Sequence, residues 1–130
     1  TTWVVNRMLE LRNRYQPTAI VLDPAGPARA LITDLTAAGI ELTQPNGGKV
    51  GEACGFFYDR VTTGQFAHRD DPDLSAALVG ARKRPLGDGG WAWSRKDSTV
   101  DISPLVALTL ATWSAHQHRA EATQGETHLW

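Results

Sequence analysis

Thr18-Ala-Ile-Val-Leu22, followed at once by Asp23, is a short apolar run of strand length. Runs of this kind are typical of parallel strands, which are buried on both faces of a sheet. Apolar residues at three- and four-residue steps predict an amphipathic helix before the run, over residues 3–15. A second helix, entered through proline and glycine and ended by a glycine, is predicted over residues 24–39, and a second strand over residues 40–43. The order helix, strand, helix, strand indicates an α/β fold with parallel neighbouring strands.

Downstream of this unit the same reasoning predicts three more helices and one β-hairpin. Asp71-Pro72 and Ser103-Pro104 are typical helix starts, with Ser103 as the N-cap, and Gly-rich turn chemistry separates the two arms of the hairpin. The predicted helices cover residues 50–63, 72–81 and 103–113, and the hairpin covers residues 82–96. We expect a single domain over residues 1–115, because no linker divides the chain, and a polar, disordered tail over residues 116–130.

Composition narrows the class of protein. The chain has 130 residues, 42% of them hydrophobic, and 13 Lys and Arg oppose 14 Asp and Glu to give a formal charge of -1. This balance of charges excludes a histone-like, strongly basic protein that covers nucleic acid, but it allows a local basic patch. The single Cys54 cannot form an internal disulfide and has apolar neighbours, so we expect it to be buried in an intracellular protein. No apolar run approaches the roughly 20 residues that span a bilayer, so we expect no membrane partner.

Two aspartates are candidate catalytic residues and metal ligands. Asp23 directly follows a predicted parallel strand, where ligands bind in open α/β sheets, although a turn aspartate is the simpler alternative. Asp101 precedes the last helix by two residues, where the helix dipole favours an ionised carboxylate, and a purely helix-stabilising role is its alternative. A divalent cation would hold two such carboxylates together.

A basic and aromatic segment is the candidate nucleic-acid surface. Five of the thirteen cations lie within fifteen residues and are interleaved with Trp91 and Trp93, which suits a phosphate backbone. A solvated hairpin with core tryptophans is an equally weighted alternative. The cations are Arg82, Lys83, Arg84, Arg95 and Lys96. His68 is an auxiliary candidate for metal binding or proton transfer.

Taken in order, six short motifs resemble the C-terminal nuclease domain of the large terminase subunit of tailed phages, especially in phages and prophages of actinobacteria. The match runs from about Trp3 to Trp113. The motifs are Val21-Leu-Asp-Pro-Ala-Gly26, Cys54-Gly-Phe-Phe-Tyr-Asp59, His68 with Asp71-Pro-Asp-Leu74, Lys83-Arg-Pro-Leu-Gly-Asp88, Trp91-Ala-Trp-Ser-Arg95 and Asp101-Ile-Ser-Pro-Leu105.

The resemblance implies a ribonuclease H-like mixed sheet flanked by helices. It also implies endonucleolytic cutting of concatemeric double-stranded DNA with two Mg²⁺ or Mn²⁺ ions, one activating water and the other stabilising the leaving oxygen. Asp23 matches the second of the family's three acidic positions and Asp101 matches the third. The implied partners are an ATPase domain, a portal and a small terminase subunit, in the cytoplasm of a bacterial host.

The chain departs from the family pattern at the first acid, which lies on a strand that would precede residue 3. We therefore expect a domain that lacks its first strands, of uncertain activity by itself, with an exposed sheet edge through which two copies could pair. Asp97, Asp70 or Asp71 could replace the missing acid. Ser98 stands where some relatives have a histidine, three residues before the third acid.

Two other functions fit the same residues. One is a non-catalytic module of the same fold that docks on DNA, a portal or a small terminase subunit. The other is a different ribonuclease H-like nuclease, such as a resolvase.

Overall fold

The computed structural model describes residues 2–64, 72–87 and 89–128, with side chains up to residue 122. Its contacts divide into two compact units, Thr1–Asn46 and Gly47–Trp130, and each unit has its own apolar core. The sequence predicted one domain, because the loop-forming residues 44–48 at this boundary are as typical of a short connection within a domain as of a division between two. Over the described residues the protein is mixed α/β, with five α-helices and one two-stranded antiparallel sheet. None of the described helices combines the length and the apolar character that a membrane crossing requires.

The first unit contains α1 (Thr2–Tyr15), the 3₁₀ helix η1 (Pro27–Leu31) and α2 (Ile32–Ala37). Its core consists of three buried side chains, against which the apolar stripe of α1 packs, as the helical spacing predicted. Gly39 has φ +85°, which confirms the predicted glycine end of the second helix, because only glycine adopts this conformation without strain. The buried residues are Leu22, Leu35 and Ile40, and the residues of α1 packed on them are Val5, Met8 and Leu9.

The two predicted parallel strands of the first unit form one parallel bridge, between Val21 and Thr43. The Leu22 N–H donates to the Thr43 carbonyl at 2.9 Å, and the Thr43 N–H donates to the Ile20 carbonyl at 2.8 Å. The predicted direction is therefore confirmed, but the predicted strand lengths are wrong. Both segments still supply buried side chains, Leu22 and Ile40, so the apolar runs marked burial, which does not require a long ladder.

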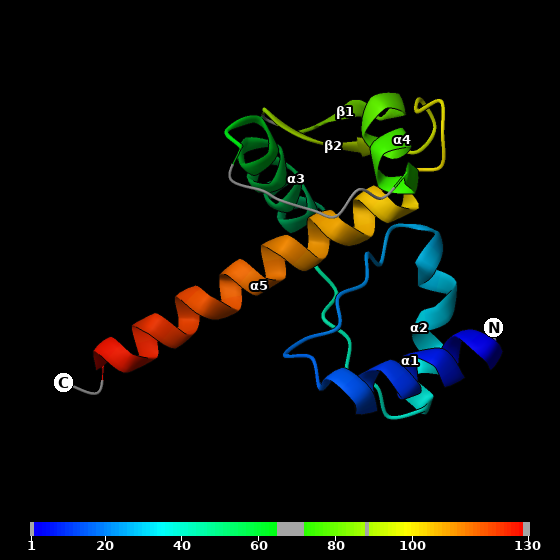
Figure 1. Ribbon diagram of the computed structural model, residues 1–130, viewed down its shortest axis with the longest axis vertical. Helices are drawn as coiled ribbons and strands as arrows, with labels where there is room; N and C mark the ends of the chain where they lie inside the picture. Colours follow the sequence, from blue (N-terminus) through cyan, green and yellow to red (C-terminus); the bar gives the residue numbers. More distant parts are fainter. Residues whose placement is uncertain (1, 65–71, 88, 129–130) are drawn as a thin grey trace. The chain divides into compact units, whose positions relative to one another are not determined.

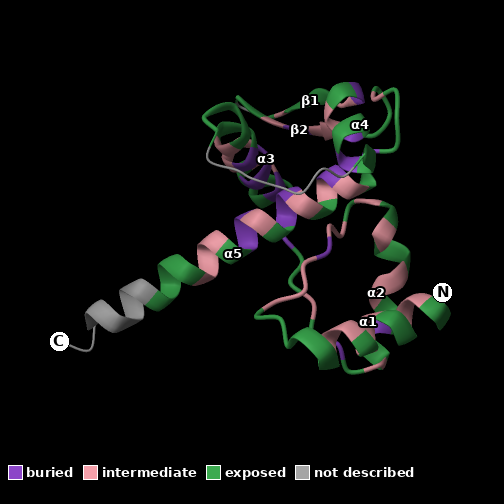
Figure 2. Cartoon of the chain, in the orientation of Figure 1, coloured by how far each residue is buried: buried purple, intermediate pink, exposed green. Residues whose placement is uncertain are grey.

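The second unit contains α3 (Gly47–Thr62), α4 (Pro72–Gly80), β1 (Arg82–Leu86), β2 (Gly90–Ser94) and α5 (Ser103–His128). Helices α3 and α4 pack on the first half of α5, and the hairpin packs on α3 (Figure 1). The purple segments of Figure 2 mark the buried residues at their junction. This core confirms the predicted helices, and Cys54 is buried in α3 as expected. It consists of Phe57, Leu74, Ala77, Ile102 and Leu105.

The last helix differs from its prediction at both ends. Helix α5 continues to His128, whereas the sequence predicted a helix over residues 103–113 and a disordered tail over residues 116–130. At the start, Ser103 is the first helical residue, and the Asp101 carboxylate, not the Ser103 hydroxyl, accepts a backbone N–H. The predicted extended residues 65–68, with His68, lie outside the described residues, as do Asp70 and Asp71.

Candidate functional site

Asp23 lies two residues after the bridged Val21, at the carboxyl end of the parallel pair. Its Oδ1 accepts the backbone N–H of Ala25 at 2.9 Å, which forms the turn that leads into η1. A Cβ added to Gly26 would lie 3.4 Å from the other carboxylate oxygen, Oδ2. This distance is an ordinary van der Waals contact, so a Cβ at position 26 would not displace this oxygen. The position therefore combines the predicted turn role with an approachable carboxylate oxygen.

Asp101 lies at the start of α5 and is exposed. Its Oδ1 accepts the backbone N–H of Ser103 at 2.9 Å. This backbone hydrogen bond is the largest cause that lowers the pKa of Asp101, followed by a hydrogen bond to the Ser103 side chain and the positive charge of Arg95. The carboxylate thus accepts a backbone N–H at the helix start, where the sequence had predicted Ser103 as the N-cap and had left helix stabilisation by Asp101 as the alternative to metal binding.

The two carboxylates are held by separate cores, because Asp23 belongs to the first unit and Asp101 to the second. Each uses one oxygen in a local backbone hydrogen bond. Carboxylate oxygens suit Mg²⁺ or Mn²⁺ in kind. Over residues 2–64, 72–87 and 89–128, however, no group of three or more His, Cys, Asp or Glu side chains is close enough to hold a metal ion. The two carboxylates therefore offer the kind of oxygen ligand that these cations prefer, but they are fewer than the three acidic ligands that the resemblance implies.

The predicted basic hairpin is present as an antiparallel pair in which Lys83 lies opposite Trp93 and Arg84 lies opposite Ala92. Side chains alternate between the faces of a strand, so Arg82 and Arg84 share one face of β1, and Lys83 lies on the other. All three cationic residues are exposed. The hairpin therefore carries positive charge on both of its faces.

Lys83 is held in an aromatic cluster, which we define as Tyr58, Trp91 and Trp93. Its ammonium nitrogen lies 3.7 Å from the centroid of the Tyr58 ring and 4.3 Å from that of Trp91. The rings themselves meet edge to face, with centroids 5.7 Å apart for Tyr58 and Trp91 and 4.9 Å apart for the two tryptophans. A cation over an aromatic face gains about 0.5–2 kcal/mol. Since Tyr58 belongs to α3, the cluster joins the hairpin to that helix.

The two tryptophans were predicted at this surface, but Tyr58 was not. The sequence placed it only in the predicted helix over residues 50–63 and in the motif of residues 54–59, because its contact with Lys83 joins residues that are distant along the chain. No sequence pattern marks such a contact. A tyrosine on a helix face has the same spacing whether it meets a lysine or solvent.

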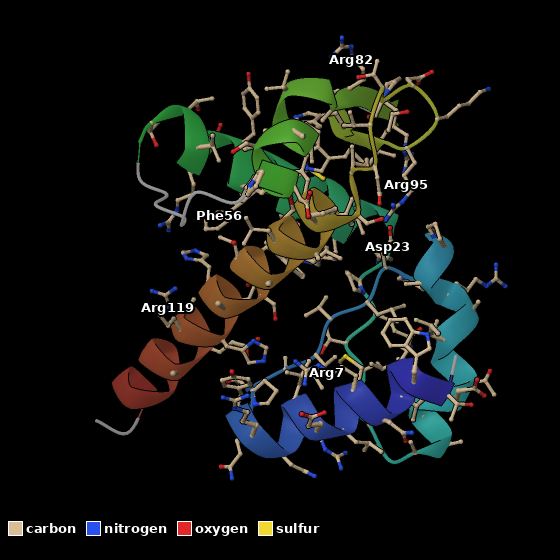
Figure 3. The ribbon with its side chains drawn as sticks, turned by 45° about the vertical axis from the view of Figure 1, so that its right-hand side comes forward. Arg7, Asp23, Phe56, Arg82, Arg95 and Arg119 are labelled. Atoms are coloured by element: carbon tan, nitrogen blue, oxygen red, sulfur yellow. The ribbon has the colours of Figure 1, made fainter. Side chains whose placement is uncertain are left out.

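The two arginines of β1 are held much less tightly. Arg82 donates one side-chain hydrogen bond, from Nη1 to the Ala81 carbonyl at 3.1 Å, and its side chain points away from the helices of its unit (Figure 3). In the described part of the chain, no hydrogen bond, ion pair or ring contact engages the Arg84 side chain. A guanidinium has five N–H donors, so most of those on Arg82 and Arg84 remain available.

The other two predicted cations differ from each other. Arg95 Nη1 donates to the Ser103 hydroxyl at 3.0 Å and so belongs with Asp101 at the start of α5. Lys96 lies exposed in the turn that follows β2. The structure therefore brings together Arg95 and Asp101, which the sequence had assigned to two different sites.

The auxiliary candidates Asp97 and Ser98 form a local network around Ser94. Ser94 Oγ donates to the Asp97 carboxylate at 2.9 Å and accepts the Asp97 N–H at 3.1 Å. The Ser98 hydroxyl donates to the Ser94 carbonyl and accepts the Arg82 N–H at the edge of β1. These contacts close the chain after β2 against the hairpin, which gives both residues a structural role.

A further cluster lies between α3 and α5 and was not predicted. Phe56, which projects from α3 (Figure 3), lies between the Arg60 guanidinium, 4.7 Å from its ring centroid, and the His116 ring, at 4.5 Å. His116 had been assigned to the polar tail, so this contact could not be anticipated. It packs the middle of α5 against α3.

Comparison with known protein families, with curated proteins and with solved structures finds no match to this chain.

Proposed function

We propose that this chain is the nuclease domain of a large terminase subunit, with a ribonuclease H-like fold, and that it contributes to metal-dependent cutting of double-stranded viral DNA. On this proposal it works beside an ATPase domain, a portal and a small terminase subunit in the cytoplasm of a bacterial host. The motif order of the sequence is the first support. The Asp23 carboxylate and the basic surface of the hairpin add further support.

The observation that carries the proposal is the position of Asp23. It follows a segment paired in parallel with residue 43, and ligands of open α/β sheets bind outside the carboxyl ends of parallel strands. The Ala25 N–H occupies Oδ1 of Asp23, so Oδ2 is the oxygen that a ligand would contact.

Asp101 adds a second ionised carboxylate. Like any exposed aspartate it is negative at neutral pH, and its Ser103 hydrogen bond fixes its position at the helix start. On the proposal, Asp23 and Asp101 would hold the cation, which when bound supplies Lewis-acid activation of water and of the scissile phosphate. Arg95, next to Asp101, would then help to hold the negatively charged substrate.

We expect plasmid nicking to depend on both carboxylates. Supercoiled plasmid is incubated with Mn²⁺ and either this chain or a longer polypeptide that adds the ATPase region implied by the resemblance. Replacing a metal ligand removes the cation's contribution, so Asp23→Ala and Asp101→Ala should each lower nicking at least about 100-fold, on the scale of losing a dominant electrostatic contribution. Asp34→Ala, at an exposed aspartate of α2, is the matched control and should nick like the wild type.

Retained nicking in either variant contradicts the proposal, as does absence of nicking by both wild-type polypeptides. DNA binding is measured on the same variants to separate loss of chemistry from loss of substrate.

A docking module without catalysis is the second candidate, and one observation favours it. The basic hairpin and its aromatic cluster are complete within the second unit and need no residue of the first. This candidate predicts that reversing the charges of Arg82, Lys83 and Arg84 abolishes DNA binding, that Asp23→Asn leaves binding intact, and that no variant nicks.

A further inference from the structure

The three consecutive cations of β1 are in different physical states. Lys83 places its ammonium between two aromatic rings, whereas Arg82 donates a single side-chain hydrogen bond and Arg84 none within the described residues. An ammonium over aromatic faces has given up part of its water shell and already has electrostatic partners. A guanidinium with open N–H donors retains its capacity for bidentate contacts to phosphate.

The spacing of the two arginines also suits a polyanion. Residues two apart on a strand lie on the same face, about 7 Å from one another. Each guanidinium can therefore take its own phosphate along one nucleic-acid strand. Residues 82–96 hold five cations and one acidic residue, Asp88, so the partner must be strongly negative.

We propose that β1 divides its cations between two roles: Arg82 and Arg84 contact phosphates of double-stranded DNA, and Lys83 is a positioning residue that fixes the hairpin on α3 through Tyr58 and Trp91. This inference deepens the proposed function and rests on its DNA substrate. It separates residues that sequence alone treats as one basic run.

The experiment measures the salt dependence of DNA binding. Binding of the full chain to a fluorescein-labelled 30-base-pair duplex is followed by anisotropy in EDTA between 50 and 200 mM KCl. The slope of log K against log salt is negative, and each lost phosphate contact should reduce its magnitude by about 0.9. We expect this reduction for Arg82→Gln and for Arg84→Gln, and twice the reduction for the double variant.

Lys83→Met keeps the apolar stem and removes the charge from the aromatic cluster. We expect weaker binding by a similar factor at every salt concentration, an unchanged slope, and altered tryptophan fluorescence, since Trp91 loses its cation. Lys83→Arg restores a cation to the rings and should restore both readouts. Arg29→Gln, at an exposed cation of η1 in the first unit, controls for net charge and should leave slope and fluorescence unchanged.

The inference is overturned if Lys83→Met reduces the magnitude of the slope as the arginine variants do. It is also overturned if Arg82→Gln and Arg84→Gln leave the slope unchanged, or if the wild type does not bind the duplex. Competition by polyglutamate at the same charge concentration as the duplex also overturns it, because the surface would then suit an acidic protein. The binding assay does not measure nicking. If the chain fails to nick plasmid, the division of roles within β1 is therefore unaffected, and if the division of roles fails, the nuclease proposal is unaffected.

Discussion

At the scale of single residues, Asp101 shows how one side chain can satisfy two interpretations. Its carboxylate caps α5, and it is also the family's third acidic position by resemblance. The cap requires only a hydrogen-bond acceptor, whereas a cation requires the negative charge. Replacing the carboxylate by an amide therefore separates the two roles.

The lowered pKa of Asp101 makes its contribution to stability depend on pH. Because the folded state holds the proton less tightly than the unfolded state, the stabilisation is present above the ordinary aspartate pKa of about 3.9 and is lost as the pH falls through the lower folded value. We expect Asp101→Asn to unfold at a lower temperature than the wild type at pH 7, with a difference that disappears toward pH 2.5. Thermal unfolding followed by circular dichroism at several pH values measures this.

Asp34→Asn, at an exposed aspartate of α2, is the reference for general charge effects. A difference for Asp101→Asn that stays constant across the whole pH range would show that the charge of Asp101 does not stabilise α5.

At the scale of elements, the end of α4 approaches the segment after β2 closely. The Thr99 N–H donates to the Gly80 carbonyl at 3.1 Å. A Cβ at position 80 would lie 2.5 Å from the Cγ2 atom of Val100 and 2.8 Å from the Thr99 hydroxyl oxygen. Both neighbours are β-branched and stiff at χ1, so they cannot turn aside easily.

We therefore expect Gly80→Ala to lower the free energy of unfolding by about 1–3 kcal/mol, as overpacking does elsewhere. Gly55→Ala is the matched control, because Gly55 lies within α3 and a Cβ there would meet nothing within 4 Å. That variant should gain about 0.5–1 kcal/mol from helix propensity. Urea unfolding of both variants gives the comparison, and equal effects of the two substitutions would contradict the close approach.

At the scale of the whole molecule, the proposed functions divide between the two units. The first holds Asp23, and the second holds Asp101 and the basic hairpin. Each has its own core, so binding and cutting need not depend on the same part of the chain. The phosphate contacts proposed for β1 involve the second unit alone.

Residues 47–130 should therefore bind the DNA duplex with the salt slope of the full chain. Their core and hairpin contacts are internal to the unit. The same anisotropy titration tests this, with circular dichroism to confirm that the fragment is helical. A folded fragment with a markedly smaller slope would mean that the first unit supplies phosphate contacts.

Local patterns predicted much of what the structure contains. Helical spacing gave the helices, glycine and proline marked their ends, and the turn after Leu86 predicted the hairpin, because these depend on neighbours within a few residues. Asp23 and Asp101 were found as element-boundary acids for the same reason, and each accepts a local backbone N–H, while their role as metal ligands stays a prediction.

What the tertiary structure decided involves residues distant along the chain. The division at Asn46, the reduction of two predicted strands to one bridge, the length of α5 and the contact of Lys83 with Tyr58 each depend on which surfaces meet. Burial and ring contacts are energies between surfaces that folding brings together, and a local pattern holds no record of them. The sequence alone determined the elements and the chemistry available at their ends. Folding determined which of its cations already have a partner.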